Sequence, residues 1–261
     1  MLEAGNGNVQ AFHLAGIVPV AGPDLGFGFP WHDSMQPIAK NYLAVERSIV
    51  ECAYAGCETI WVVCNDDMQP RQIPIFYTPI HPKDRDRRDS LGWSALHGAL
   101  TAFIMSDKIS KWLIPSRYYV SFPYGVYQPW SIYKHRKRIS HRNPFFLSSN
   151  GKTIKDGEYL GFTFDAEEYK TYVADVKQSC TGGDRGVSSK ERWSSRFFGL
   201  DKIFGSAIIN KEQTLEIPWY HRIDSWEGLH GYLASDESKE VKRPSDTLFK
   251  KSLYKKVGEQ E

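Results

Sequence analysis

The sequence predicts an α/β fold, a three-layer αβα sandwich with a mostly parallel central sheet. Continuous apolar runs, which are typical of strands buried on both faces, occur at residues 14–20 and 59–64. Helical patterns alternate with the strands over the first 125 residues. The chain has 261 residues, which is enough for one large domain of this kind.

The first predicted strand, Leu14–Val20, leads straight into a loop rich in glycine. The loop contains Gly22, Gly26 and Gly28, and glycine lets a backbone approach a ligand closely. Ligands of open α/β sheets bind outside the carboxyl ends of the strands, which is where this loop begins. An ordinary surface loop would show the same residues, so both interpretations stay open.

A helix is predicted next, at residues 37–56, because apolar residues recur there at helical spacing. Its charged residues Glu46, Arg47 and Glu51 are expected on the solvent-facing side. Gly56 follows the pattern where a C-cap glycine belongs.

The second strand is the β-branched run Thr59–Cys64, and a third is expected at 73–80, where two prolines favour a sheet edge. Asp165 and Glu168 are expected to form a capping box at the start of a later helix. The other expected elements are helices at 90–105, 166–177, 190–204 and 225–233, strands at 118–122 and 159–164, and an extended segment at 214–223.

Composition and charge are those of an ordinary globular protein. The net charge is +2, from 33 basic and 31 acidic side chains, so no global field attracts nucleic acid. The four cysteines lack C-x-x-C spacing, which predicts reduced thiols and disfavours zinc. No secretory signal or membrane-length apolar run is present, and a cytoplasmic protein is expected.

Residues 1–10 are expected to be a flexible lead-in, 11–235 a single domain and 236–261 a charged tail.

Three groups of residues are candidates for chemistry, each with a structural alternative. Asp66 and Asp67 end a predicted inner strand, where a ligand or merely a solvated turn is expected. Asp224 is either a functional carboxylate or the N-cap of its helix. The basic run Lys134–Arg138, beside Trp130, suits phosphate or nucleic acid, although a solvated basic helix face explains it equally simply.

Three segments together resemble the sugar-phosphate nucleotidyltransferases and their glycosyltransferase-A-like relatives. They are VERSIVECAYAGCETIWVVCND, SLGWSALHGAL and RIDSWEGLHGYL, and the resemblance extends over residues 12–235. It implies a protein that binds a nucleotide or nucleotide-sugar, with Mg²⁺ if it is an active transferase. The residues that it implies are Ala21, Gly22, Gly26, Gly28, Gly92 and Ser94 for the nucleotide, Asp66, Asp67 and Asp224 for the metal, and Lys40 and Asp224 for catalysis.

The sequence also departs from that pattern. The fourth strand of the family ends in a metal-binding aspartate, whereas this chain has Ser121 there and no carboxylate before Asp156. The family loop carries a basic residue after its glycines, and here Lys40 and His32 are the two candidates. The alternative is therefore a catalytically silent member of the fold that serves in assembly, for example in a virus particle. Tryptophans that are expected to be exposed, such as Trp226, would suit protein partners, and no membrane partner is expected.

Overall fold

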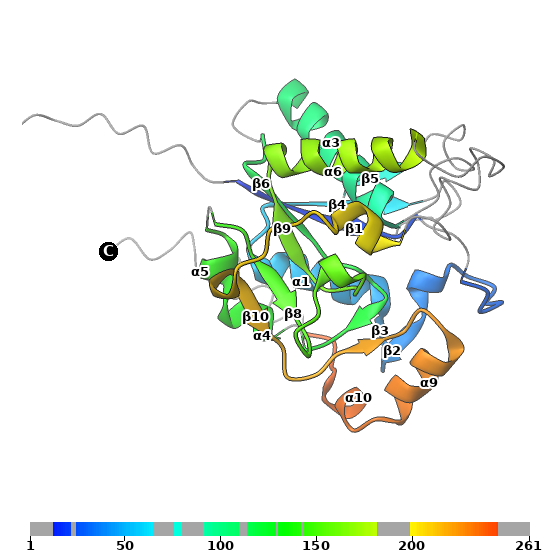
Figure 1. Ribbon diagram of the computed structural model, residues 1–261. Coiled ribbons are helices and arrows are strands. Elements are labelled where there is room, and N and C mark those ends of the chain that lie inside the picture. Colours follow the sequence, from blue (N-terminus) through cyan, green and yellow to red (C-terminus); the bar gives the residue numbers. More distant parts are fainter. Residues whose placement is uncertain are drawn as a thin grey trace, which may run out of the picture.

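A mixed sheet of seven strands forms the middle layer of the molecule (Figure 1), in the order β10-β8-β9-β6-β1-β4-β5. Strand β9 runs against its neighbours β6 and β8, and the other pairings in this sheet are parallel. The sheet strands are β1 Leu14–Pro19, β4 Thr59–Cys64, β5 Phe76–Pro79, β6 Arg117–Val120, β8 Phe146–Ser148, β9 Phe162–Phe164 and β10 Thr214–Glu216. This computed structural model describes residues 13–21, 25–64, 76–79, 91–109, 114–128, 130–141, 143–181 and 199–244.

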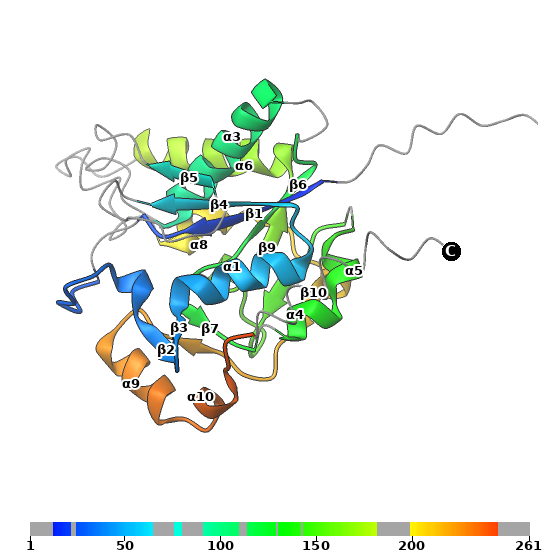
Figure 2. The same ribbon diagram turned by 180° about the vertical axis from the view of Figure 1, so that it is seen from behind.

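Helices cover both faces of the sheet, as Figures 1 and 2 show from opposite sides. One face carries α3 Leu91–Ile109, α6 Ala166–Thr181 and α8 Leu200–Phe204, and the other carries α1 Ala44–Ala55, α4 Trp130–Lys134 and α5 Arg136–Ile139. The predicted three-layer αβα sandwich is therefore confirmed. Across the described ranges, no helix combines the length and apolar character needed to cross a bilayer.

Strand β1 lies inside the sheet between β4 and β6, as its continuous apolar run predicts. Its side chains alternate, so that Ile17 faces α3 and Val18 faces α1. Two glycines let helices lie close to it. A Cβ at Gly16 would come within 2.8 Å of Cys52 on α1, and a Cβ at Gly98 on α3 would come within 2.8 Å of Ile17. Both positions therefore require glycine for packing rather than for an unusual backbone conformation.

The first helix differs from its predicted form. It begins at Ala44, because the preceding residues form a hairpin of β2 Pro37–Ala39 and β3 Tyr42–Leu43. Gly56 ends the helix with φ +97°, which confirms the predicted C-cap. The solvent-facing assignment of Arg47 and Glu51 is wrong, because both side chains are fully buried and form an ion pair of 2.7 Å.

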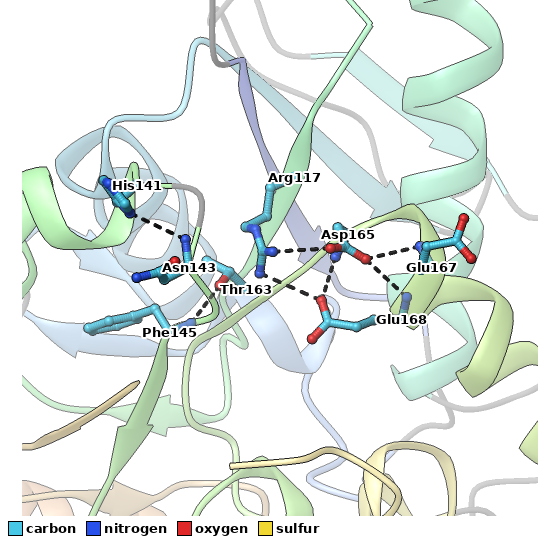
Figure 3. A network of polar contacts seen from close by, with 8 residues as sticks. All are labelled: Arg117, His141, Asn143, Phe145, Thr163, Asp165, Glu167 and Glu168. Carbon is cyan, nitrogen blue, oxygen red and sulfur yellow. Dashed lines mark hydrogen bonds and ion pairs between the residues drawn. The ribbon is translucent and has the colours of Figure 1, made fainter. Parts of the chain in front are cut away.

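The predicted capping box at Asp165 is confirmed (Figure 3). The Asp165 carboxylate accepts hydrogen bonds from the backbone N–H groups of Glu167 and Glu168, at 2.9 and 3.0 Å. The Glu168 carboxylate accepts the N–H of Asp165 in return, at 2.8 Å. Arg117 at the start of β6 pairs with both carboxylates, at 3.1 and 3.6 Å. This network fixes α6 to the sheet.

A smaller apolar cluster lies beside the main sandwich. It joins the β2–β3 hairpin, Phe27, α9 Trp226–Ala234 and Val241, which follows α10 Glu237–Glu240. A two-stranded ribbon of β7 Gly125–Val126 and β11 His221–Arg222 connects this cluster to the end of β6. Short 3-10 turns complete the described chain: η1 Asp33–Met35, η3 Ile154–Asp156 and η4 Lys211–Gln213. Val241, within the expected tail, is 2% exposed.

Buried tyrosines predict that the fold loses stability at alkaline pH. Burial, helped by the Glu51 carboxylate, raises the pKa of Tyr119 and Tyr127 well above the ordinary value, and burial raises the pKa of Tyr232 to about 12. In the unfolded chain these phenols ionise near pH ~10. Their contribution to stability is therefore complete below about pH 10 and is lost as the pH rises toward the folded pKa values.

We accordingly expect the melting temperature to fall steeply above about pH 10. Ultraviolet absorbance of tyrosinate measures the ionisation, and circular dichroism measures unfolding in the same samples. Tyrosinate absorbance from these residues should rise only together with unfolding. Full ionisation near pH ~10 in a protein that remains folded would contradict the prediction.

Candidate functional site

A cavity of about 290 Å³ opens at the carboxyl edge of the sheet, beyond the end of β6. Five separate segments of the chain meet there, besides the start of α3. The lining residues are Leu25, Leu91, Tyr124, Asp156, Gly157, Tyr159, Gly199, Leu200, Asp201 and Arg222. The set combines apolar and aromatic surface with two aspartates and an arginine, which is the usual character of a small-molecule site.

The β7–β11 ribbon brings Arg222 to this cavity. Gly125 pairs with Arg222 across the ribbon, and Ile223 donates its N–H to the Tyr124 carbonyl at 2.9 Å. Gly125 cannot be replaced without movement, because a Cβ there would lie 2.1 Å from the Tyr159 carbonyl. The close approach of these backbones therefore places one basic side chain among the lining residues.

Arg222 is held from several sides. Its Nε donates to the Asp224 carboxylate at 2.7 Å, and a second guanidinium nitrogen also lies 2.7 Å from that oxygen. The guanidinium lies over the Tyr159 ring at 4.7 Å from the centroid. Burial and then the Asp224 carboxylate raise the pKa of Tyr159, so its phenol stays protonated. A second carboxylate, on Glu158, lies 4.0 Å from the guanidinium, so the cavity presents a fixed cation that already has two acidic partners.

A hydrogen bond joins Ala21 and Ser94, two of the residues predicted to bind a nucleotide. The Ser94 hydroxyl, in the first turn of α3, donates to the Ala21 carbonyl just beyond β1. The Ala21 N–H is itself taken by the Val63 carbonyl at 2.8 Å. Gly92 packs against α8, since a Cβ there would lie 2.5 Å from Ile203. These residues join β1, α3 and α8 around the cavity, and among them only the neighbouring Leu91 lines it.

The other predicted residues are placed as follows. Gly26 and Gly28 adopt φ of +78° and +68°, with open space where a Cβ would project. This backbone conformation favours glycine. Lys40 is exposed in the β2–β3 turn and does not line the cavity. The predictions for Gly22, Asp66 and Asp67 lie outside the described residues.

Asp224 is not the N-cap of α9. That role belongs to Ser225, whose hydroxyl accepts the Gly228 N–H at 3.1 Å. In the part of the chain that the structure describes, no three His, Cys, Asp or Glu side chains are grouped to hold a metal ion. Asp224 is paired with Arg222, and Ser121 turns its hydroxyl to Glu51. The described residues alone therefore do not fit a divalent cation, which needs several oxygen ligands.

The sequence reasoning missed the polar network at the end of β6. Glu51 accepts four hydrogen bonds, from Arg47 at 2.7 Å, Ser121 at 2.8 Å, Tyr119 at 2.6 Å and Tyr127 at 2.5 Å. Arg47 also donates to the Phe122 carbonyl at 2.9 Å. The available signal was spacing, because Arg47 and Glu51 lie four residues apart on the stripe of α1 that contains buried Ser48 and Cys52.

The comparisons with known proteins agree on the fold. No protein-family model matches the sequence, and no curated protein is significantly similar to it. A protein assigned as a glucose-1-phosphate thymidylyltransferase from Bacillus anthracis, solved with sucrose, matches with a TM-score of 0.55 and 9% identity, covering 89% of this chain and 98% of that chain. The inositol-1-phosphate CTP transferase from T. maritima matches with a TM-score of 0.50 and 11% identity, covering 90% of this chain and 99% of that chain.

A nucleoside-diphosphate-sugar pyrophosphorylase from Vibrio cholerae gives a TM-score of 0.50 and 12% identity, covering 84% of this chain and 100% of that chain. Identities this low establish the fold alone. The resemblance that the motifs predict is therefore confirmed at that level: this chain has the fold of the sugar-phosphate nucleotidyltransferases, as a divergent example of it.

Proposed function

We propose that this protein binds a nucleotide or nucleotide-sugar at the carboxyl edge of its sheet, in the manner of a nucleotidyl- or glycosyl-transferase. The observation that carries the proposal is the cavity beyond β6, which is lined by Arg222 and bordered by the start of α3. Ligands of open α/β sheets bind at this edge.

The phosphate end of such a ligand belongs beside the glycine loop and the first turn of α3. N–H groups in the first turn of a helix have no partner within the helix and favour anions. Gly26 and Gly28, with open space on their Cβ sides, allow close approach of a phosphate. Arg222 adds a guanidinium to the lining of the cavity, where it is shared with Asp224 at 2.7 Å and Glu158 at 4.0 Å.

The sugar end fits the cavity itself. Asp156 and Asp201 offer carboxylate oxygens that accept hydrogen bonds from hydroxyl groups but repel phosphate. Tyr124 and Tyr159 line the same cavity, with ring centroids 5.8 Å apart, and give the apolar face of a sugar ring a surface to pack on. We therefore assign the sugar, rather than the phosphates, to the aspartate-lined part of the site.

A thermal-shift screen of nucleoside triphosphates, nucleoside diphosphates and nucleotide-sugars, each with and without magnesium, tests the proposal. A ligand at 100 times its Kd should stabilise the protein by about 2.7 kcal/mol. Asp201→Ala should weaken the binding of nucleotide-sugars more than the binding of the matching diphosphates. Lys202 is exposed on the same helix, and Lys202→Ala should change neither affinity. The absence of any shift at millimolar concentration would reject the proposal, and a positive screen would be followed by turnover assays.

A second candidate function is assembly without catalysis, for example in a virus particle. Two observations favour it. The end of β6 carries Ser121, and its hydroxyl is bound to Glu51 instead of facing the cavity. Trp31 and Trp226 are 47% and 56% exposed, and both contact Phe29 in an aromatic cluster. Binding of a nucleotide-sugar without turnover would be compatible with this function, whereas turnover by the isolated monomer would exclude it.

A further inference from the structure

A second surface, formed by α4, α5 and the end of α1, lies on the opposite face of the sheet from α8 (Figures 1 and 2). Its sequence is unusually one-sided, because no Asp or Glu occurs between Asp107 and Asp156. Lys134 and Lys137 are exposed there, and neither forms an ion pair with any described residue. The net charge of +2 therefore conceals a local concentration of positive charge.

Aromatic rings lie beside these cations. Trp130 and Tyr133, one turn apart on α4, are 45% and 37% exposed, and their rings stack at 4.8 Å with 19° between the planes. Tyr54 of α1 meets both rings edge-on, at 6.2 and 5.6 Å. The stack is thus held in place before any ligand arrives, which lowers the entropic cost of binding.

We propose that this surface binds a single-stranded nucleic acid. Flat, exposed rings accept unpaired bases by stacking, and adjacent lysines bind the phosphates, which is the usual combination in proteins that bind single strands. A protein partner is less well matched, because the centre of a protein interface is depleted in lysine. Here an exposed Lys134 directly follows Tyr133 on α4, and an exposed Lys137 lies on the next helix, α5. The inference is independent of the nucleotide proposal, since the two surfaces share no residue.

The test measures fluorescence anisotropy of a labelled thymidine 20-mer with the full chain at several salt concentrations. Trp130→Ala with Tyr133→Ala should weaken binding about 5- to 150-fold if one base is stacked. Lys134→Ala with Lys137→Ala should reduce the slope of log affinity against log salt by about 1.4, since each phosphate contact on a single strand contributes about 0.7. Melting temperatures of both variants report whether they fold.

Matched controls come from the other surfaces of the protein. Trp31→Ala with Trp226→Ala removes two tryptophans of similar exposure, and Lys202→Ala with Lys239→Ala removes two exposed lysines. Neither control should change binding. The proposal is overturned if the oligonucleotide does not bind at low salt, if a duplex of equal length binds as tightly, or if only vesicles containing phosphatidylserine bind.

Discussion

Replacing Glu51 with alanine should destabilise the protein by about 3–5 kcal/mol, because the substitution leaves Arg47 as an unpaired charge inside the core. Both side chains have no exposed surface, and the Arg47 guanidinium also lies over the Tyr127 ring at 4.6 Å. The loss extends beyond the ion pair. Three hydroxyl groups, on Tyr119, Ser121 and Tyr127, lose their common acceptor at the same time.

Chemical denaturation measures the free energy of unfolding of three single variants: Glu51→Ala, Ser121→Ala and Glu167→Ala. Ser121→Ala removes one hydrogen bond and should cost about 1 kcal/mol. Glu167→Ala, the matched control, removes a carboxylate that is 80% exposed and pairs with Lys170, and should lie within about 0.5 kcal/mol of the parent protein. A cost for Glu51→Ala as small as that for Glu167→Ala would show that the network contributes little to stability.

The same network explains why Ser121 and an acidic residue are not interchangeable in this chain. The Ser121 hydroxyl lies 2.8 Å from the Glu51 carboxylate, so an aspartate in its place would face a buried like charge. The departure from the family pattern at the end of β6 is thus linked to Glu51 on α1. An acidic residue at the end of β6 would therefore also require a change at Glu51 on α1.

The fold could be predicted from the sequence largely because its inner strands are continuous apolar runs. Thr59–Cys64 is reproduced residue for residue, and β1 differs from its prediction by one residue at its end. The start of α1 could not be predicted, since Pro37–Leu43 also fits a helical pattern until the turn at Asn41, with φ +55°, is known. The predicted exposure of Arg47 and Glu51 was wrong, because two opposite charges four residues apart are compatible with an exposed helix face as well as with a buried ion pair.

The candidate site was predicted less well than the fold. Glycine spacing drew attention to the carboxyl edge of the sheet, where the cavity opens, but the cavity is lined by residues from Leu25 to Arg222 that meet only in three dimensions. Asp156 belongs to a short turn that was not predicted, and Asp201 lies in α8, inside the helix expected at 190–204, where nothing marked its carboxylate as functional. Arg222 stands two residues before Asp224, and it acquires significance only when the β7–β11 ribbon places it beside Tyr159.

Arg222→Ala should weaken binding of a nucleotide-sugar by about 10- to 150-fold, because a hydrogen bond to a charged group contributes about 1.5–3 kcal/mol. The loss should be equal with and without magnesium, since the guanidinium supplies its charge directly. Arg222→Lys should recover part of the affinity, because lysine keeps the charge but lacks the planar fork that reaches Asp224 and a ligand together. Arg243, 51% exposed on another part of the surface, is the matched control: Arg243→Ala should leave affinity unchanged.

Asp224→Asn separates the two roles open to this carboxylate. Its contact with Arg222 at 2.7 Å favours a positioning role, so we expect affinity to fall with and without magnesium alike, while the melting temperature changes little because Ser225 still caps α9. Isothermal titration with one nucleotide-sugar, repeated at several magnesium concentrations, measures both affinities. A variant that keeps its magnesium-free affinity and loses only the gain from magnesium would instead make Asp224 a metal ligand, in partnership with Asp66 or Asp67, as the family resemblance implies.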